Sequence, residues 1–283
     1  MITRFAPSPT GPLHLGHAFS ACLAHDQARA AQGLFYLRIE DIDQTRARPV
    51  WEEQLKDDLL WLGLTWDAPP LRQSERMKYY QAALDTLWHR GLLYPCTCKR
   101  KDIAAAAQAP QEGAPLLGPD GVIYPGTCRH VPDMTAPRPS DTALRLNWRA
   151  ALPHLPETLG WLETGTLHNI ETAGICETIG DVVLARPGMG TSYHLSVVLD
   201  DAEQGITDVI RGADLAEATA IHVALGHLLS LPIPRYHHHA LIRDQTGKRL
   251  AKRDDARALA KFRAEGASPM LIRAMLGLTP LSR

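Results

Sequence analysis

Two histidines in the stretch RFAPSPTGPLHLGHA (residues 4–18) have a type and spacing suited to catalysis. An apolar start at 2–6, a Gly/Pro turn at 7–11 and an amphipathic segment predict a strand, a loop and a helix in that order. The start of such a helix presents backbone N–H groups and a positive dipole end, which suit a phosphate. His14 and His17 share one face there, and imidazoles can stabilise growing negative charge. A tight turn with incidental histidines is the simpler alternative.

A second candidate for phosphate chemistry is the basic segment DQTGKRLAKRDDA at 244–256. Gly247 permits a turn, and four cations follow within the six residues from 248 to 253. This composition predicts a loop that clamps phosphates, whereas a solvated basic loop is the simpler interpretation.

The cysteines are the third candidate group. Cys96, Cys98 and Cys128 lie in one stretch, and a reducing compartment disfavours disulfides, so we expect a metal site. Three thiolates and one more donor satisfy tetrahedral zinc. Ligand chemistry favours His130 as that donor, although Tyr124 also lies nearby. Three reduced cysteines packed in a loop are the alternative.

The elements that position these residues alternate between strand and helix. We expect strands at 2–6, 34–39, 182–185, 193–199 and 238–242, and helices at 13–32, 49–62, 74–90 and 216–229, with two short helices after 254. Such alternation predicts an α/β fold with a doubly wound parallel sheet. Residues 95–140 break the pattern with prolines, glycines and the cysteines, so we interpret them as an insertion.

Composition excludes several classes of protein. The 283 residues are 45% hydrophobic, so we expect a globular protein. The net charge is −1, so any contact with nucleic acid must use local patches of positive charge. No apolar run reaches the length of a membrane span, and no signal-peptide pattern begins the chain. We therefore expect a cytoplasmic protein with no membrane partner. A monomer is a separate expectation.

The first motif, taken whole, resembles the HIGH signature of class I aminoacyl-tRNA synthetases, in the form typical of the glutamyl and glutaminyl branch. The resemblance continues through LRIEDID at 37–43, YPCTC at 94–98, YHLSVVLDD at 193–201, VIRGADL at 209–215 and RLAKR at 249–253. It implies a Rossmann-type catalytic domain that activates glutamate with ATP and passes the glutamyl group to a tRNA.

The resemblance also implies roles in ATP binding. The basic segment corresponds to the KMSKS-like loop, where Lys252 falls on the position of the lysine that contacts the triphosphate. Two departures are Arg249 in place of a lysine and Ala251 in place of a serine. Mg²⁺ is expected with the nucleotide. The catalytic residues implied are His14, His17 and Lys252, and the ATP-binding residues are His14, Gly16, His17, Arg249 and Lys252.

Glutamate needs partners at both ends, for which arginine and carboxylate are the natural groups. By resemblance, Arg4 faces the side-chain carboxylate and Glu40 pairs with the α-ammonium. Val197 stands where the discriminating glutamyl enzymes usually carry asparagine, which points towards a paralogue. The glutamate-binding residues implied are Arg4, Ala6, Ser8, Glu40, Tyr193 and Arg211.

Only 30 residues follow Arg253, so we expect no anticodon-binding domain. This layout resembles the truncated paralogue group that attaches glutamate to the queuosine base of tRNA-Asp. The group implies one structural zinc per chain on Cys96, Cys98, Tyr124 and Cys128, and we prefer Tyr124 to His130 on that ground. Two alternatives stay open: an adenylate-forming ligase acting on a different amine or tRNA acceptor, and an inactive tRNA-binding paralogue.

The expected organisation is therefore a catalytic domain interrupted by an insertion. We predict the first half of the Rossmann domain at 1–94, a zinc-binding insertion at 95–140 within an acceptor-end-type region that continues to about 175, the second half at 176–242, and the KMSKS-like loop with a helical segment at 243–283. The three adjacent histidines of RYHHHALI at 235–242 alternate between strand faces, so they cannot share one metal.

Overall fold

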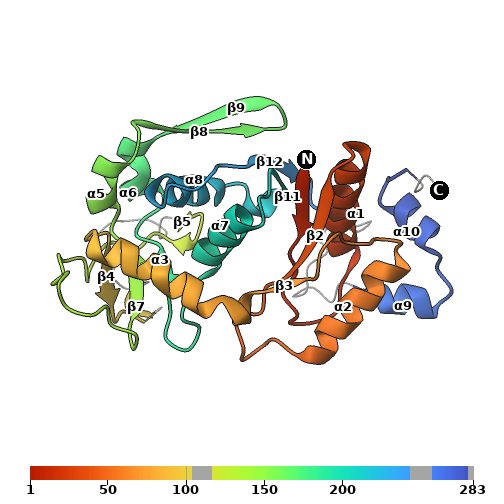
Figure 1. Cartoon of the computed structure of the whole chain (residues 1–283), viewed down its shortest axis with the longest axis horizontal. Helices are drawn as coiled ribbons and strands as arrows, with labels where there is room; N and C mark the ends of the chain where they lie inside the picture. Colours follow the sequence, from red (N-terminus) through yellow and green to blue (C-terminus); the bar gives the residue numbers. More distant parts are fainter. Residues whose placement is uncertain (100, 104–116, 243–256, 280–283) are drawn as a thin grey trace. The chain divides into compact units, whose positions relative to one another are not determined.

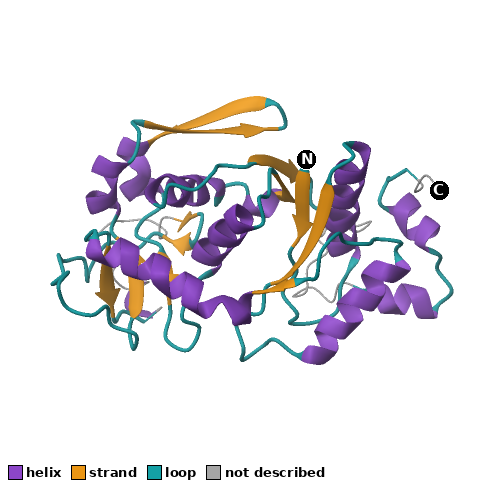
Figure 2. Ribbon diagram, in the orientation of Figure 1, coloured by secondary structure: helices purple, strands orange, loops and turns teal. Residues whose placement is uncertain are grey.

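A computed structural model describes residues 1–99, 101–103, 117–242 and 257–279 (Figures 1 and 2). The chain divides into two compact units, each built from separate stretches of sequence. The first comprises Met1–Glu75, Gly205–Asp214 and Pro234–Arg283, and the second comprises Arg76–Gln204 and Leu215–Ile233. The domain boundaries expected from the sequence stay predictions.

The first unit contains parallel strands and the helices that follow them. Strands β1 (Ile2–Phe5), β2 (Leu34–Ile39) and β3 (Leu71–Arg72) pair in parallel in the order β1-β2-β3. Strand β11 (Asp208–Gly212) pairs in parallel with β12 (Arg235–His239). The helices of this unit are α1 (Leu15–Ala30), α2 (Pro49–Trp61), α9 (Leu259–Ala264) and α10 (Pro269–Met275).

The core of the first unit explains this arrangement. Helix α1 packs against β1, β2 and β11, and its buried alanines and Cys22 allow a close approach to the strands. Thr207, just before β11, donates its backbone N–H to the carbonyl of Ile2 at 3.0 Å, so β11 begins beside β1. Gly33 turns the chain from α1 into β2, and a Cβ there would collide with the carbonyl oxygen of Met1.

The second unit is built on an antiparallel sheet. Its strands β4 (Leu93–Cys96), β7 (Ala143–Leu146) and β10 (Val183–Ala185) are ordered β10-β7-β4. Two hairpins join β5 (Leu117–Gly118) to β6 (Gly121–Val122) and β8 (Thr158–Glu163) to β9 (Thr166–Glu171). The helices are α3 (Met77–His89), α5 (Trp148–Ala151), α6 (Ile175–Thr178), α7 (Tyr193–Glu203) and α8 (Thr219–Leu228). Short 3-10 turns occupy Leu152–His154 and Thr172–Gly174 in this unit, and Gln73–Arg76 and Ala213–Leu215 where the chain passes from the first unit to the second.

One buried carboxylate ties this sheet to its surroundings. Asp181 accepts hydrogen bonds from the Tyr94 hydroxyl at 2.5 Å, the Arg129 Nε at 2.7 Å and the Trp148 backbone N–H at 3.1 Å. All four residues belong to the second unit, and Asp181 is almost fully buried. The carboxylate therefore fixes elements that flank the cysteine-bearing segments.

The structure confirms the α/β class but corrects two expectations. The sheets are mixed rather than uniformly parallel, because β4, β7 and β10 run antiparallel. The expected strand at 193–199 is wrong: these residues begin α7, whose first turn is capped when Ser192 Oγ accepts the Leu195 N–H at 3.4 Å. Tyr193, Leu195, Val197 and Leu199 stand at every second position with His194 and Ser196 between them, so the start of this buried helix has the apolar period of a strand.

The described helices include none long and apolar enough to cross a membrane.

Candidate functional site

The two histidines of the first motif form the N-terminal cap of α1. His14 is the N-cap residue, and its Nδ1 accepts the Gly16 backbone N–H at 3.1 Å. His17 returns the contact, because its Nδ1 accepts the His14 backbone N–H at 3.2 Å. The two rings stack with centroids 3.8 Å apart and planes 26° apart. The pair is thus a reciprocal capping box in which imidazoles replace the usual hydroxyl and carboxyl groups.

This cap determines which nitrogen of each ring carries the proton. A ring nitrogen that accepts a hydrogen bond has no proton, so a neutral imidazole then bears its N–H at Nε2. Both His14 and His17 therefore present Nε2–H as a donor at the start of α1, where the helix dipole also favours an anion. The arrangement can stabilise an oxyanion.

The residues that follow the basic segment lie beside this cap. Lys252 and Arg249 fall outside the described residues. The described chain resumes at Arg257, and the next residue, Ala258, forms an antiparallel bridge with His14. Leu259 donates its backbone N–H to the carbonyl of Leu13 at 2.8 Å. The residues that follow the basic segment are therefore held directly against the histidine motif.

The carboxyl ends of β1 and β2 bring several predicted glutamate-binding residues into one region. Arg4 lies on β1, with Ala6 and Ser8 in the loop after it. Glu40 follows β2, and its backbone N–H donates to the carbonyl of Pro7 at 3.0 Å, which joins the two strand ends. Ligands of parallel α/β sheets bind outside the carboxyl ends of the strands.

Charge is concentrated in this region. Arg4 and Glu40 are both buried, with Arg4 only 5% exposed. The Glu40 carboxylate also faces the fully buried Arg38, with Nε and Oε1 3.5 Å apart. An arginine and a carboxylate in one region offer groups complementary to both charges of an amino acid.

Arg211 sits near the end of β11, where neighbouring residues of β12 hold it. Its Nε–H donates to His238 Nε2 at 3.1 Å, and its guanidinium lies 5.1 Å from the centre of the Tyr236 ring. The sequence interpretation did not single out His238 for this contact, which depends on the parallel register that places it opposite Arg211.

The three adjacent histidines of β12 contact three different partners. His237 Nε2 lies 3.2 Å from Asp208 Oδ1, and His239 Nε2 lies 2.7 Å from Ser20 Oγ, whereas His238 contacts Arg211. The three imidazoles therefore contact different groups and do not converge on one point, as their alternation along a strand predicts.

Tyr193 belongs to the second unit, where it begins α7. Its ring lies 5.5 Å from that of His194 and 5.6 Å from that of His222. His194 Nδ1 and His222 Nε2 are 3.1 Å apart, and the other side of His194 faces Asp120 at 3.5 Å. These buried imidazoles fix the ring of Tyr193 at the helix start. Val197, the position that departs from the glutamyl enzymes, is buried one turn further along.

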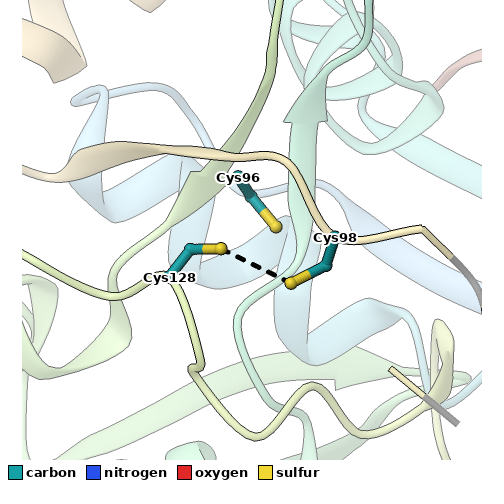
Figure 3. A group of neighbouring side chains, drawn as sticks. All are labelled: Cys96, Cys98 and Cys128. Atoms are coloured by element: carbon teal, nitrogen blue, oxygen red, sulfur yellow. Dashed lines mark hydrogen bonds between the residues drawn. The ribbon is translucent and has the colours of Figure 1, made fainter. Parts of the chain in front are cut away.

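The three predicted cysteine ligands come together at the end of β4 (Figure 3). The Sγ atoms of Cys96, Cys98 and Cys128 all lie within 4.8 Å of one another, with those of Cys98 and Cys128 at 3.4 Å. A tetrahedral zinc with Zn–S bonds of about 2.3 Å has its sulfurs about 3.8 Å apart. The spacing therefore fits a single metal ion.

The hydroxyl of Tyr124 lies beside the three thiols. Its Oη lies 3.4 Å from Cys96 Sγ and 3.5 Å from Cys98 Sγ, and it accepts the Cys128 backbone N–H at 2.8 Å. His130 is directed elsewhere, with Nδ1 2.7 Å from the Cys128 carbonyl. Among the described residues, the side chain that contacts the thiols is therefore Tyr124, whereas the hydrogen bond of His130 is to a backbone carbonyl.

The cluster favours a thiolate at Cys128. Burial acts to raise the pKa of that thiol, but hydrogen bonds from the Tyr124 hydroxyl and the Thr97 backbone N–H outweigh it and lower the pKa to about 6. Burial and the hydrogen bonds to the cysteines raise the pKa of Tyr124 in the absence of a metal. A bound cation would favour both anionic forms.

Comparison with known proteins gives the family context. Residues 1–282 match the family described as tRNA synthetases class I (E and Q), catalytic domain. A glutamyl-Q tRNA(Asp) synthetase of Rhodobacter capsulatus is 64% identical, over 98% of this chain and 100% of its own length. Another protein of that name, from Symbiobacterium thermophilum, is 42% identical over 94% of this chain and 82% of its own.

Solved structures give the same picture. A glutamate tRNA ligase from Elizabethkingia meningosepticum, in complex with its amino acid, is 27% identical with a TM-score of 0.75 and is matched over 98% of this chain. The chain spans 60% of the length of that ligase. The methionyl-tRNA synthetase of Mycobacterium tuberculosis, at 11% identity and a TM-score of 0.57, shares the fold.

Proposed function

The chain belongs to the class I glutamyl- and glutaminyl-tRNA synthetase family of ligases, and from that premise we propose that it activates L-glutamate with ATP and transfers the glutamyl group to queuosine in the anticodon of tRNA-Asp. The choice of queuosine in tRNA-Asp as acceptor rests on one observation: the chain is 64% identical to a protein named glutamyl-Q tRNA(Asp) synthetase, over the full length of that relative. The domain boundaries, the site residues and the zinc site predicted from the sequence form part of this proposal.

Activation is the first step. A carboxylate oxygen of glutamate attacks the α-phosphorus of ATP, a P–O bond forms, and pyrophosphate leaves with the electrons of the broken bond. The Nε2–H groups of His14 and His17 donate to phosphate oxygens as charge grows, and they need no reorganisation because the capping box fixes both rings. Lys252 and Arg249 neutralise the leaving pyrophosphate, and Gly16 lets the nucleotide approach the helix start. Mg²⁺ supplies further neutralisation when bound with the nucleotide.

Glutamate is held at the carboxyl ends of the parallel strands. Arg4 binds the side-chain carboxylate, with Ala6 and Ser8 lining the loop beside it. Glu40 binds the α-ammonium, and its burial strengthens that pairing. Arg211 and Tyr193 complete the set of glutamate-binding residues.

Transfer follows activation. A hydroxyl of the queuosine cyclopentene diol attacks the acyl carbon and a C–O ester bond forms. The C–O bond of the mixed anhydride breaks, AMP leaves with its electrons, and the hydroxyl proton passes to a phosphate oxygen of the leaving AMP or to water. The diol mimics the vicinal hydroxyls of a terminal ribose, so the same activated acyl group serves this acceptor.

A structural zinc ion on Cys96, Cys98, Tyr124 and Cys128 stabilises the insertion. The spacing of the donors supports this assignment, as does the small core around them, which besides Tyr94 consists largely of the ligands themselves. When bound, the ion supplies cross-linking between β4 and the segment at 124–128 and takes no part in the chemistry.

The proposal is tested by exchange of labelled pyrophosphate into ATP. We expect exchange that depends on glutamate and proceeds without tRNA, because the proposed pocket needs no RNA component. Absence of exchange with any amino acid would favour the inactive paralogue, and exchange driven better by another amino acid would favour the alternative ligase.

A further inference from the structure

Arg145 occupies a rigid position beside the cysteine cluster. It lies on β7, the middle strand of the sheet β10-β7-β4, where its register partners are Tyr94 on β4 and Val183 on β10. Only 7% of the residue is exposed. A buried guanidinium is costly unless anionic or polar groups surround it.

The guanidinium contacts two of the four proposed metal donors. Its Nε–H donates to Cys96 Sγ at 3.2 Å, and its Cζ lies 3.8 Å from the centre of the Tyr124 ring. Its Nη1–H donates to the Asp181 carbonyl at 2.6 Å, which fixes the plane of the group. The guanidinium of Arg145 thus donates a hydrogen bond to the Cys96 sulfur and also lies over the face of the Tyr124 ring.

The charge of a filled site explains why a cation belongs there. A divalent ion bound by three thiolates carries one net negative charge, and a phenolate ligand adds a second. Burying that charge beside a sheet is unfavourable without compensation. A guanidinium that donates to one thiolate and lies over the phenolate ring supplies a positive charge in contact with both, and partners of this kind tune metal affinity.

We propose that Arg145 is a positioning residue of the metal site, which raises metal affinity by compensating the charge of the Cys96 thiolate and the Tyr124 phenolate. The inference rests on the proposed zinc site. It predicts that loss of the arginine weakens metal binding even where the sheet remains folded, because the contacts that carry it are made to the ligands.

The test is metal affinity measured on the whole chain by competition with a chelator, for zinc and for cobalt(II). Arg145→Met keeps much of the side-chain volume and removes the charge, whereas Arg145→Lys keeps the charge without the planar donor. Arg138→Met is the matched control, because Arg138 is another arginine of the second unit whose side chain is largely buried. Its guanidinium pairs with Asp85 at 2.8 Å and donates to Gln81, and neither hydrogen bond is to a cysteine. Cobalt also gives a sulfur-to-metal charge-transfer band that reports on the thiolate ligands.

We expect Arg145→Met to bind zinc about 10- to 100-fold more weakly and to shift the cobalt band, with Arg145→Lys between it and the parent and Arg138→Met within threefold of the parent. If Arg145→Met does not fold, a weaker affinity and shifted band in folded Arg145→Lys carry the test. Parent-like zinc affinity and an unchanged cobalt band in the folded arginine variants would overturn the inference and leave the zinc site in place. A parent protein that binds no metal would instead overturn the zinc site itself.

Discussion

Replacing His14 by asparagine separates the two roles of this residue. Asparagine is among the best N-cap residues, so its side-chain oxygen replaces Nδ1 as acceptor for the Gly16 N–H. What it lacks is the imidazole Nε2–H. His14→Asn should therefore keep the helix start and lose the donor to phosphate.

The magnitudes of the two effects differ enough to be resolved. The cap is one neutral hydrogen bond at 3.1 Å, worth about 1 kcal/mol when removed by His14→Ala and close to zero when asparagine restores it. The lost transition-state donor should cost about 2 to 4 kcal/mol, which is roughly 30- to 1000-fold in the rate of activation. The rate should thus fall in both variants, whereas stability falls only in His14→Ala.

The assay combines pyrophosphate exchange at saturating glutamate with unfolding by urea. His17→Gln gives a second test, because glutamine at the third helical position also completes a capping box. His227→Asn, at an exposed histidine of α8, is the control for loss of an imidazole. Exchange within threefold of the parent in His14→Asn would refute the catalytic role and leave the histidines as a structural cap.

Three further predictions follow from the same structure. Lys252→Ala should cost about 2 to 4 kcal/mol in pyrophosphate exchange with little change in the KM for glutamate, and a rate within threefold of the parent would contradict its role. Cys98→Ser should release zinc measured by elemental analysis, whereas Cys176→Ser, outside the cluster, should retain it; equal zinc in both variants would argue against Cys98 as a ligand. Burial and the neighbouring Asp57 raise the pKa of Asp58 from 3.8 to about 6. The folded state therefore binds this proton more tightly than the unfolded state, and the free energy of unfolding falls as the pH rises from about 4 to 6. Asp58→Asn should then stabilise the protein at pH 8 by up to about 3 kcal/mol and bring no gain near pH 4, and a gain in urea unfolding that does not change with pH would exclude this cause.

Local signals in the sequence predicted much of the fold. Strand β2 has the predicted bounds, and α2 ends within one residue of its prediction, because an apolar pattern and Pro49 mark them locally. Helix α7 was mistaken for a strand because its first seven residues place apolar side chains at every second position, and the packing that makes this segment a buried helix is not a local signal. The antiparallel sheet of the second unit depends on pairing between β4 and β7, which lie far apart in sequence, and no local pattern specifies that pairing.

The residues of the candidate site likewise fall into those with a local sequence signal and those without one. The histidine motif and the cysteines were found by spacing, since their partners lie within a few residues or share a compact segment. Arg145 and His238 were missed, because each acts through strand register that brings it to Cys96 or Arg211. A lone arginine and the middle histidine of three carry no local signal for such contacts.

The most direct test of the proposed function is labelling of tRNA-Asp with radioactive glutamate, using the same tRNA with queuosine or with guanine at the modified position. We predict labelled glutamate on the queuosine-containing tRNA and none on the tRNA with guanine. Equal labelling of both forms, or charging of the 3′ end of tRNA-Glu, would contradict the account and identify the protein as an ordinary aminoacylating enzyme.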